Sequence, residues 1–216
     1  MSKKPGKARA AAEREKKILA ASMKVFSKYG YQDTEVEDIA SLAGLGKGTV
    51  YRHFGSKENL FFSTLEWGLT TLADEMDEAI SAVHGYVDKV RTALVTYLLF
   101  FEKHRDFYGI LVQDRMRTEI KSPPHRLMKK HMALISHLTD VLEEGIKDGY
   151  FKKIDVESAA HALFGIINSL LFKWLTSRKR YPIRKEVSVI EEIFLNGILS
   201  AQQATTATKE RRKERR

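Results

Sequence analysis

The chain has 216 residues, of which 43% are hydrophobic and none is cysteine. This length suits one medium domain or a small head joined to a larger body, and the absence of cysteine excludes disulfides and thiolate metal sites. The formal net charge of +9 lies in the two ends, because residues 1–17 carry seven basic and two acidic side chains and residues 209–216 carry six and two. We expect the second segment to be a solvated, disordered tail, whereas the first suits either a polyanion partner or plain solubility.

The sequence contains no targeting or membrane segment that we can identify. The N-terminal segment is basic, but no apolar core follows it, so we expect no secretory signal. No apolar run reaches the roughly 18 residues that a membrane span needs, because His161, Asn168 and Lys173 interrupt the most apolar stretch, Ala159 to Leu175. The sequence therefore predicts a cytoplasmic protein with no membrane partner.

Two helices are predicted in the first part of the chain. Apolar residues recur every three or four positions from about Ala10 until Gly30 ends the first helix. Thr34 with Glu37 has the spacing of a capping box, in which the hydroxyl accepts from a backbone N–H and the carboxylate reaches back. A second helix is therefore expected to open at Asp33-Thr34.

A glycine turn, Gly44-Leu45-Gly46, separates this helix from a short third helix that runs from about Lys47 to His53. Val50 and Phe54 are expected to face inward. The side chains left on or near the outer face are Lys47, Thr49, Tyr51, Arg52 and His53. A helix can enter the major groove and present such side chains to base edges, so the stretch from Thr34 to Lys57 predicts a DNA-reading head.

Other groups of this stretch suit the sugar–phosphate backbone. Gly48 lets the helix backbone approach DNA closely. Thr34 and Lys57 lie at the starts of the second and fourth helices, where free N–H groups and the helix dipole favour phosphate; capping and solvation are the alternatives for them. The candidate DNA-binding residues are Thr34, Lys47, Gly48, Thr49, Tyr51, Arg52, His53 and Lys57.

Six more helices are predicted after Ser56, with no convincing β alternation and no internal repeat. Their apolar positions run from Leu60 to Val83, Val87 to Phe101, Phe107 to Met116, Leu127 to Ile146, Val156 to about Ser177 and Val187 to about Ala201. Asp155 is a good N-cap for the eighth helix. The expected fold is all-α, with about nine helices.

The last two predicted helices need cover on more than one side. The eighth is apolar nearly all round, and the ninth carries a broad apolar face. A homodimeric four-helix seam would cover the apolar faces of both helices. Reading of bases in paired half-sites also requires a two-fold axis. Burial within a single body is the alternative.

The head resembles that of the TetR (tetracycline-repressor) family of transcriptional regulators, from Ile18 to about Phe61. The matching positions are Phe26, Gly30, Tyr31, Thr34, Val36, Ile39, Ala40, Ala43-Gly44-Leu45, Lys47-Gly48-Thr49-Val50-Tyr51, His53-Phe54, Ser56-Lys57 and Leu60. The body is similar only in outline. The resemblance implies a body that binds a small molecule and dimerises through its last two helices, and a Tyr51 that touches a DNA phosphate.

Two positions depart from the family pattern. Gly46 stands where the family often has Ser, and Glu35 stands where a small hydroxyl residue is more usual. Glycine is an acceptable N-cap, but it supplies no hydroxyl for a phosphate, and Glu35 places a negative charge near the expected DNA backbone. We therefore expect fewer phosphate contacts than in a typical member.

The effector site is less clearly marked. His161, Gly165, Asn168 and Phe172 share one face of the eighth helix, which suits either a ligand pocket or the dimer seam. Aromatic residues of the fifth and sixth helices suit a cavity lining or core packing. The candidate ligand-binding residues are Tyr97, Phe101, Phe107, His161, Phe164 and Asn168, and the expected effector is small and apolar or weakly polar.

Patterns typical of enzymes are missing. The segment around Lys47 superficially resembles a phosphate-binding loop, but Gly48 follows the lysine where Ser or Thr is required. The spacing of His125, His131 and His137 scatters them around a helix rather than gathering them as metal ligands, and no nucleophile elbow occurs. We expect no enzymatic activity, no cofactor and no metal.

Together these patterns predict a homodimeric, ligand-responsive transcriptional regulator that binds a near-palindromic operator, with repression favoured over activation. A small-molecule binding protein without specific DNA recognition is a further alternative. The predicted domains are a basic arm with the DNA-binding head (1–57), a helical body for ligand binding and dimerisation (58–208) and the basic tail (209–216).

Overall fold

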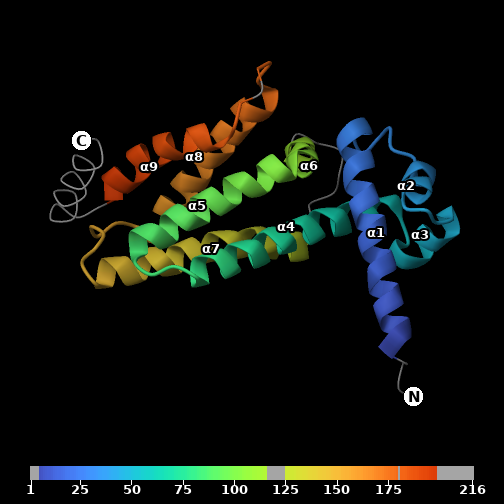
Figure 1. Cartoon of the computed structure of the whole chain (residues 1–216), viewed down its shortest axis with the longest axis horizontal. Helices are drawn as coiled ribbons and strands as arrows, with labels where there is room; N and C mark the ends of the chain where they lie inside the picture. The colour runs from blue at the N-terminus through green and yellow to red at the C-terminus, as the bar shows by residue number, and fades with distance from the viewer. Residues whose placement is uncertain (1–4, 116–124, 180, 199–216) are drawn as a thin grey trace. The chain divides into compact units, whose positions relative to one another are not determined.

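The computed structural model describes residues 5–115, 125–179 and 181–198, and in these residues it contains nine helices and no strand (Figure 1). The helices are α1 (Pro5–Tyr29), α2 (Val36–Leu42), α3 (Lys47–Phe54), α4 (Lys57–Ser81), α5 (Tyr86–Lys103), α6 (Arg105–Arg115), α7 (His125–Lys147), α8 (Val156–Thr176) and α9 (Arg184–Ile198). The prediction of an all-α fold is confirmed.

The helices form two compact units. The described residues up to Thr71, together with those between His104 and Lys130, make the first unit, and those from Leu72 to Lys103 and from His131 onward make the second. Because α6 packs against α1, this division does not coincide with the functional boundary that we placed after residue 57. Helix α4 is continuous through Thr71 and so contributes to both units.

The core of the first unit is built around aromatic rings. The rings of Phe26 and Tyr31 each lie 5.1 Å from that of Phe61, centre to centre, in edge-on geometry that favours aromatic pairs. Gly68 of α4 lies against Phe107 of α6, where any added Cβ would overlap the Phe107 ring. The aromatic contacts thus join α1 and the turn after it to α4, and the contact of Gly68 with Phe107 joins α4 to α6.

The predicted capping box at the start of α2 is wrong. Helix α2 begins at Val36, and its N-cap is Glu35, which makes no side-chain capping bond. Thr34 is fully buried, and its hydroxyl donates to the carbonyl of Gly30, 2.5 Å away. Gly30 adopts a left-handed conformation (φ 74°) that turns the chain after α1, so Thr34 fastens this turn instead of capping the next helix.

Several helix ends also differ from expectation. Helix α1 begins at Pro5, since proline suits the first helical position and the following alanine, lysine and arginine residues favour helix. Helix α4 ends at Ser81, before the expected Gly85, and α9 begins at Arg184 rather than Val187. The expected ends of the sixth helix near Ser122-Pro123-Pro124 and of the ninth at Ala201 lie outside the described residues.

Capping was predicted correctly for α8. The Asp155 carboxylate accepts from the backbone N–H groups of Glu157 and Ser158, at 3.1 and 3.3 Å. The Ser158 hydroxyl also donates to it at 2.7 Å, and these hydrogen bonds hold the pKa of Asp155 below its usual value. Asp155 thus satisfies backbone donors that the first turn of α8 would otherwise leave open.

The connection between α8 and α9 is fixed by a buried carboxylate. Glu186 is almost fully buried and accepts from the Lys173 ammonium and the Tyr181 hydroxyl, both at 2.8 Å. Burial raises the pKa of Glu186, but these two hydrogen bonds outweigh it and hold the pKa below its usual value. Trp174 donates to the Tyr181 carbonyl at 2.8 Å, so the α8–α9 pair is held together within one chain.

Helix α8 is apolar enough to change one expectation. Within the described residues, Val156–Thr176 passes the length and hydropathy criteria for a membrane span, although the sequence analysis treated His161 and Asn168 as interruptions. A mean hydropathy taken over 18 residues of the helix tolerates such isolated polar residues. The core helix of a soluble protein passes the same criteria, so α8 alone does not indicate a membrane.

Candidate nucleic-acid interface

The turn between α2 and α3 has the geometry of a helix-turn-helix. After Ala43, Gly44 adopts φ 68°, and the N–H groups of Gly44 and Leu45 donate to the carbonyls of Ser41 and Ala40 at 3.0 and 2.9 Å. This is a Schellman ending, which needs a left-handed residue, usually glycine. The chain then enters α3 directly, as the glycine turn predicted.

Val50 orients α3 within the first unit. Its side chain is only 1% exposed, so the face of α3 that carries it packs inward. Lys47, Gly48, Tyr51, Arg52 and His53 are exposed and Thr49 is half-buried. Tyr51, at 40% exposed, is therefore not a core residue. Six of the eight predicted DNA-binding residues share an open helix surface, as expected.

Gly46 precedes α3 without supplying a side-chain cap. It takes an extended conformation (φ −80°, ψ 145°) and no side-chain hydrogen bond closes the helix start. An added Cβ at Gly46 would meet nothing within 4 Å, and the same holds for Gly48. Within the protein, neither position therefore requires glycine for steric reasons. Both glycines lie at the start of α3, where no side chain caps the helix.

Lys47 forms an ion pair across the two helices of the motif. Its ammonium lies 3.4 Å from the Glu37 carboxylate of α2, and both side chains are largely exposed. An exposed pair of this kind contributes about 1 kcal/mol or less. Glu37, which was assigned to a capping box, instead neutralises part of the positive charge of α3.

Lys57 and Thr34 are engaged within the protein. The Lys57 ammonium donates to the carbonyl of Gln32 at 2.8 Å and lies 5.0 Å from the centre of the Tyr31 ring, a cation–π distance. Thr34 is buried, and its hydroxyl proton is used by Gly30. Both residues thus position the chain around α2 and α4, and the phosphate contacts predicted at Thr34 and Lys57 stay predictions.

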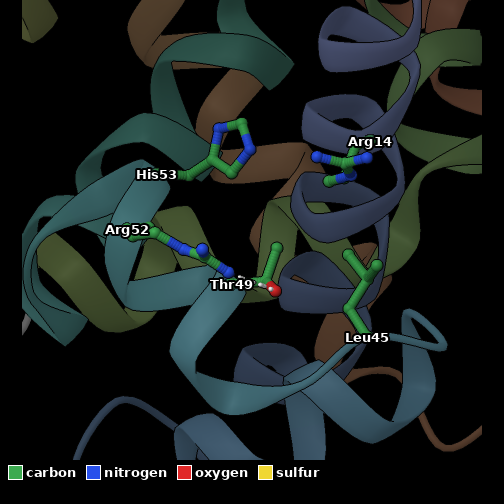
Figure 2. Close-up of a pocket in the computed structure, with 5 residues that line it drawn as sticks. All are labelled: Arg14, Leu45, Thr49, Arg52 and His53. Carbon is green, nitrogen blue, oxygen red and sulfur yellow. Dashed lines mark hydrogen bonds between the residues drawn. The ribbon is translucent and has the colours of Figure 1, made fainter.

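A hollow of about 550 Å³ lies between α1 and α3 (Figure 2). It is lined by Arg14, Leu45, Thr49, Arg52 and His53, with Arg14 on the α1 side and the other polar side chains on α3 (Figure 2). Arg52 donates to the Thr49 hydroxyl at 3.2 Å. The sequence analysis counted Arg14 only as part of the basic arm, because periodicity shows which face of a helix is polar but not what lies opposite it.

The predicted effector residues do not gather at one place. Tyr97, Phe101 and Phe164 form an edge-on cluster in the second unit, with ring centres 5.0 and 5.5 Å from that of Tyr97, and all three are buried. Phe107 belongs to the first unit. His161 is exposed on its helix within one chain, with its Nδ1 2.8 Å from the Glu157 carbonyl, so the choice between a ligand pocket and the dimer seam stays a prediction.

Asn168 is neither fully buried nor fully exposed. Its side chain is half-buried, and its amide donates to the Phe164 carbonyl one turn earlier at 2.7 Å.

A second hollow, of about 220 Å³, lies within the second unit, and its lining includes Lys89, His137 and Asp140. The described part of the chain contains no group of three or more His, Asp or Glu residues suited to a metal ion.

These features define a class of protein: an all-helical chain whose helix-turn-helix exposes a basic and aromatic second helix. The family description "Bacterial regulatory proteins, tetR family" matches residues 18–64, and "YsiA-like protein, C-terminal region" matches residues 66–197. The chain is 30% identical over 190 residues to the HTH-type transcriptional regulator YhgD of Bacillus subtilis, with 88% of this chain and 98% of that protein covered.

One further sequence relative and one solved structure are also similar to this chain. The fatty acid metabolism regulator protein of Bacillus subtilis is 24% identical, with 84% of this chain and 93% of that protein covered. The crystal structure of FadR from the same organism, in complex with stearoyl-CoA, superposes with a TM-score of 0.77 at 23% identity and covers 85% of this chain and 98% of that one.

The chain belongs to the TetR family of bacterial transcriptional regulators. It is therefore a ligand-responsive regulator of transcription, as the resemblance of its head implied.

The Glu37→Gln substitution is predicted to strengthen DNA binding. It frees Lys47 and removes a carboxylate beside the exposed face of α3, and a pair of this kind amounts to about 1 kcal/mol, or roughly fivefold in affinity. Thermal stability should change little. Fluorescence anisotropy with a labelled duplex measures the effect.

Glu143→Gln is the matched control, because it removes one exposed carboxylate from α7 in the second unit. Unchanged or weaker binding by the Glu37→Gln variant would place Glu37 and Lys47 away from the DNA.

Proposed function

We propose that the protein is a homodimeric, cytoplasmic repressor that carries no enzymatic activity. Its two α3 helices would read successive major grooves of a near-palindromic operator, about 34 Å apart. The observation that carries this proposal is the open face of α3, which holds Lys47, Tyr51 and Arg52 in solvent while Val50 anchors the opposite face.

The exposed residues of α3 suit contacts with base edges, with backbone phosphates or with both. Lys47 and Arg52 suit guanine edges or phosphates, and Thr49 suits a phosphate or a thymine methyl group. Tyr51 suits a backbone phosphate, and Gly48, where an added Cβ meets only open space in the free protein, lets the DNA approach the helix closely. Lys57 and Thr34 hold the surrounding helices in place.

Dimerisation is proposed through α8 and α9, which pack together within one chain. Their outer surface carries exposed Phe172, Val189 and Ile193. Gly165 and Gly197 are exposed on the same helices, and an added Cβ at either would meet nothing within 4 Å. Large apolar side chains beside small residues allow the close approach of a partner helix, so a second copy covers what one chain leaves in water.

The proposed effector is a fatty acyl compound of the acyl-CoA class. The fatty acid metabolism regulator among the relatives and the stearoyl-CoA complex support this class, as do the apolar rings of Tyr97, Phe101 and Phe164 in the second unit. An effector that binds the DNA-free conformation more tightly shifts the population away from DNA. The continuous helix α4 is the element through which such a change would reach the first unit.

Release of operator DNA by stearoyl-CoA, with free coenzyme A as the control, tests the effector class. The proposal requires release by the acyl compound alone. Release by both compounds or by neither would contradict an acyl effector and leave the DNA-binding role intact. Transcription from an operator-controlled promoter separates repression from activation, since an activator would raise the output.

Lys47→Ala and Tyr51→Ala are predicted to weaken operator binding strongly while the dimer and its thermal stability persist. Each truncation removes an exposed side chain from the proposed contact surface, and loss of a base contact by Lys47 would cost about 1–3 kcal/mol. A gel shift with a duplex selected from random DNA by the unaltered protein measures binding. A protein that selects no duplex would favour the small-molecule carrier, and loss of the dimer in Tyr51→Ala would assign Tyr51 a structural role instead of a DNA contact.

The Ile193→Glu substitution is predicted to give monomers. Ile193 is 58% exposed on α9, and burying an unpaired carboxylate in an apolar seam costs several kcal/mol. Sedimentation equilibrium should show the mass in solution halved, with operator binding lost because one head reads one half-site.

Met132→Glu is the control, since Met132 of α7 is 43% exposed and lies outside α8 and α9. A dimer that survives Ile193→Glu, or one that Met132→Glu disrupts equally, would move the interface away from the α8–α9 surface.

A further inference from the structure

Among the residues that the structure describes, the hollow between α1 and α3 is lined by two arginines and a histidine and by no acidic side chain. Arg14 comes from α1, and Arg52 and His53 come from α3. Arg14 is exposed and makes no ion pair or hydrogen bond with any other residue that the structure describes. Two arginines thus face one space from two helices (Figure 2), and no carboxylate neutralises them there. An anion that enters this space meets uncompensated charge.

One wall of the hollow is already arranged for an oxyanion. The Thr49 hydroxyl accepts a hydrogen bond from Arg52 at 3.2 Å, which leaves the hydroxyl proton as a donor. The same bond orders the Arg52 guanidinium, whose other N–H groups form the planar fork that matches phosphate oxygens. A side chain ordered before binding loses less conformational entropy when it binds.

The two lysines near α3 are less available to an anion than these two arginines. Lys47 is paired with Glu37, and Lys57 is hydrogen-bonded to Gln32 and lies over Tyr31. Arg14 and Arg52 therefore provide positive charge near α3 without first breaking an ion pair. Helix α1 contacts α2, and α2 contacts α3, so the position of Arg14 relative to the recognition helix is set within one compact unit.

We propose that this hollow is a clasp for the DNA sugar–phosphate backbone, closed by Arg14 from α1 and by Thr49 and Arg52 from α3. The inference rests on the proposed entry of α3 into the major groove, because a backbone strand then runs along the edge of that helix. It assigns a defined contact to Arg14, which composition alone places among the diffuse charges of the N-terminal arm. His53 and Leu45 also line this hollow.

A backbone clasp has a measurable signature. Phosphate contacts carry no direct sequence information, so loss of Arg14 should weaken operator and non-operator DNA by the same factor. Each phosphate neutralised contributes about 0.9 to the slope of log K against log salt concentration. Arg14→Gln should therefore reduce the magnitude of that slope by about 1 and leave the ratio of operator to non-operator affinity unchanged.

The experiment compares three full-length variants with the unaltered protein, on an operator duplex selected by the unaltered protein and on a scrambled duplex, across a salt series. Arg9→Gln is the matched control, since Arg9 is also an exposed arginine of α1 but lies about 140° away around the helix. We expect the slope to fall for Arg14→Gln and not for Arg9→Gln. Arg14→Lys should keep the slope and recover only part of the affinity, because lysine keeps the charge but lacks the fork.

Two outcomes overturn the clasp. One is an unchanged slope in Arg14→Gln, and the other is an equal loss in both glutamine variants, which would return Arg14 to the diffuse arm. Absence of any selected duplex for the unaltered protein would overturn the proposed function itself, so the two failures are distinguishable.

Contact is tested directly with Arg14→Cys, whose thiol is unique because the chain has no cysteine. Labelled with a photo-cross-linker, this variant should attach to the duplex, whereas Arg9→Cys should not. An uncross-linked Arg14→Cys variant that still unfolds at the normal temperature would contradict the clasp.

Discussion

Burial of the inner face of α3 is the constraint on which the functional surface depends. Val50 packs inward, and the Schellman turn at Gly44 fixes how α3 follows α2. The aromatic contacts among Phe26, Tyr31 and Phe61 then hold α1 and α4 around this motif. Because a short helix has only two faces to divide between core and solvent, anchoring one face decides which side chains are presented to a groove.

The charge on this surface is modest and selectively placed. Glu37 offsets Lys47, and Lys57 is held by the turn after α1, so neither lysine is an unopposed charge. Arg14 and Arg52 face the hollow, and none of the described residues that line it is acidic. Nonspecific attraction to DNA depends on the number of phosphates neutralised, whereas specificity depends on base edges.

Local patterns in the sequence predicted local structure well. The helix-turn-helix, the Asp155 cap and the exposed side of α3 follow from periodicity and from turn chemistry that involve only neighbouring residues. The capping role of Thr34 failed because tertiary packing draws that residue into the core, and the packing of α6 on α1 joins segments far apart in the chain. His161 was ambiguous because a polar residue on an apolar helix suits a pocket and a seam equally. The hollow beside Arg14 could not be predicted from the sequence, because its lining combines side chains of α1 and α3.

Hydroxyl-radical footprinting of the selected operator tests most directly the claim that two α3 helices read one duplex. The account predicts two protected backbone segments on one face of the DNA, with their centres about one helical turn apart, roughly 34 Å, related by two-fold symmetry. A single protected segment, or uniform protection without a fixed register, would contradict paired reading by a dimer.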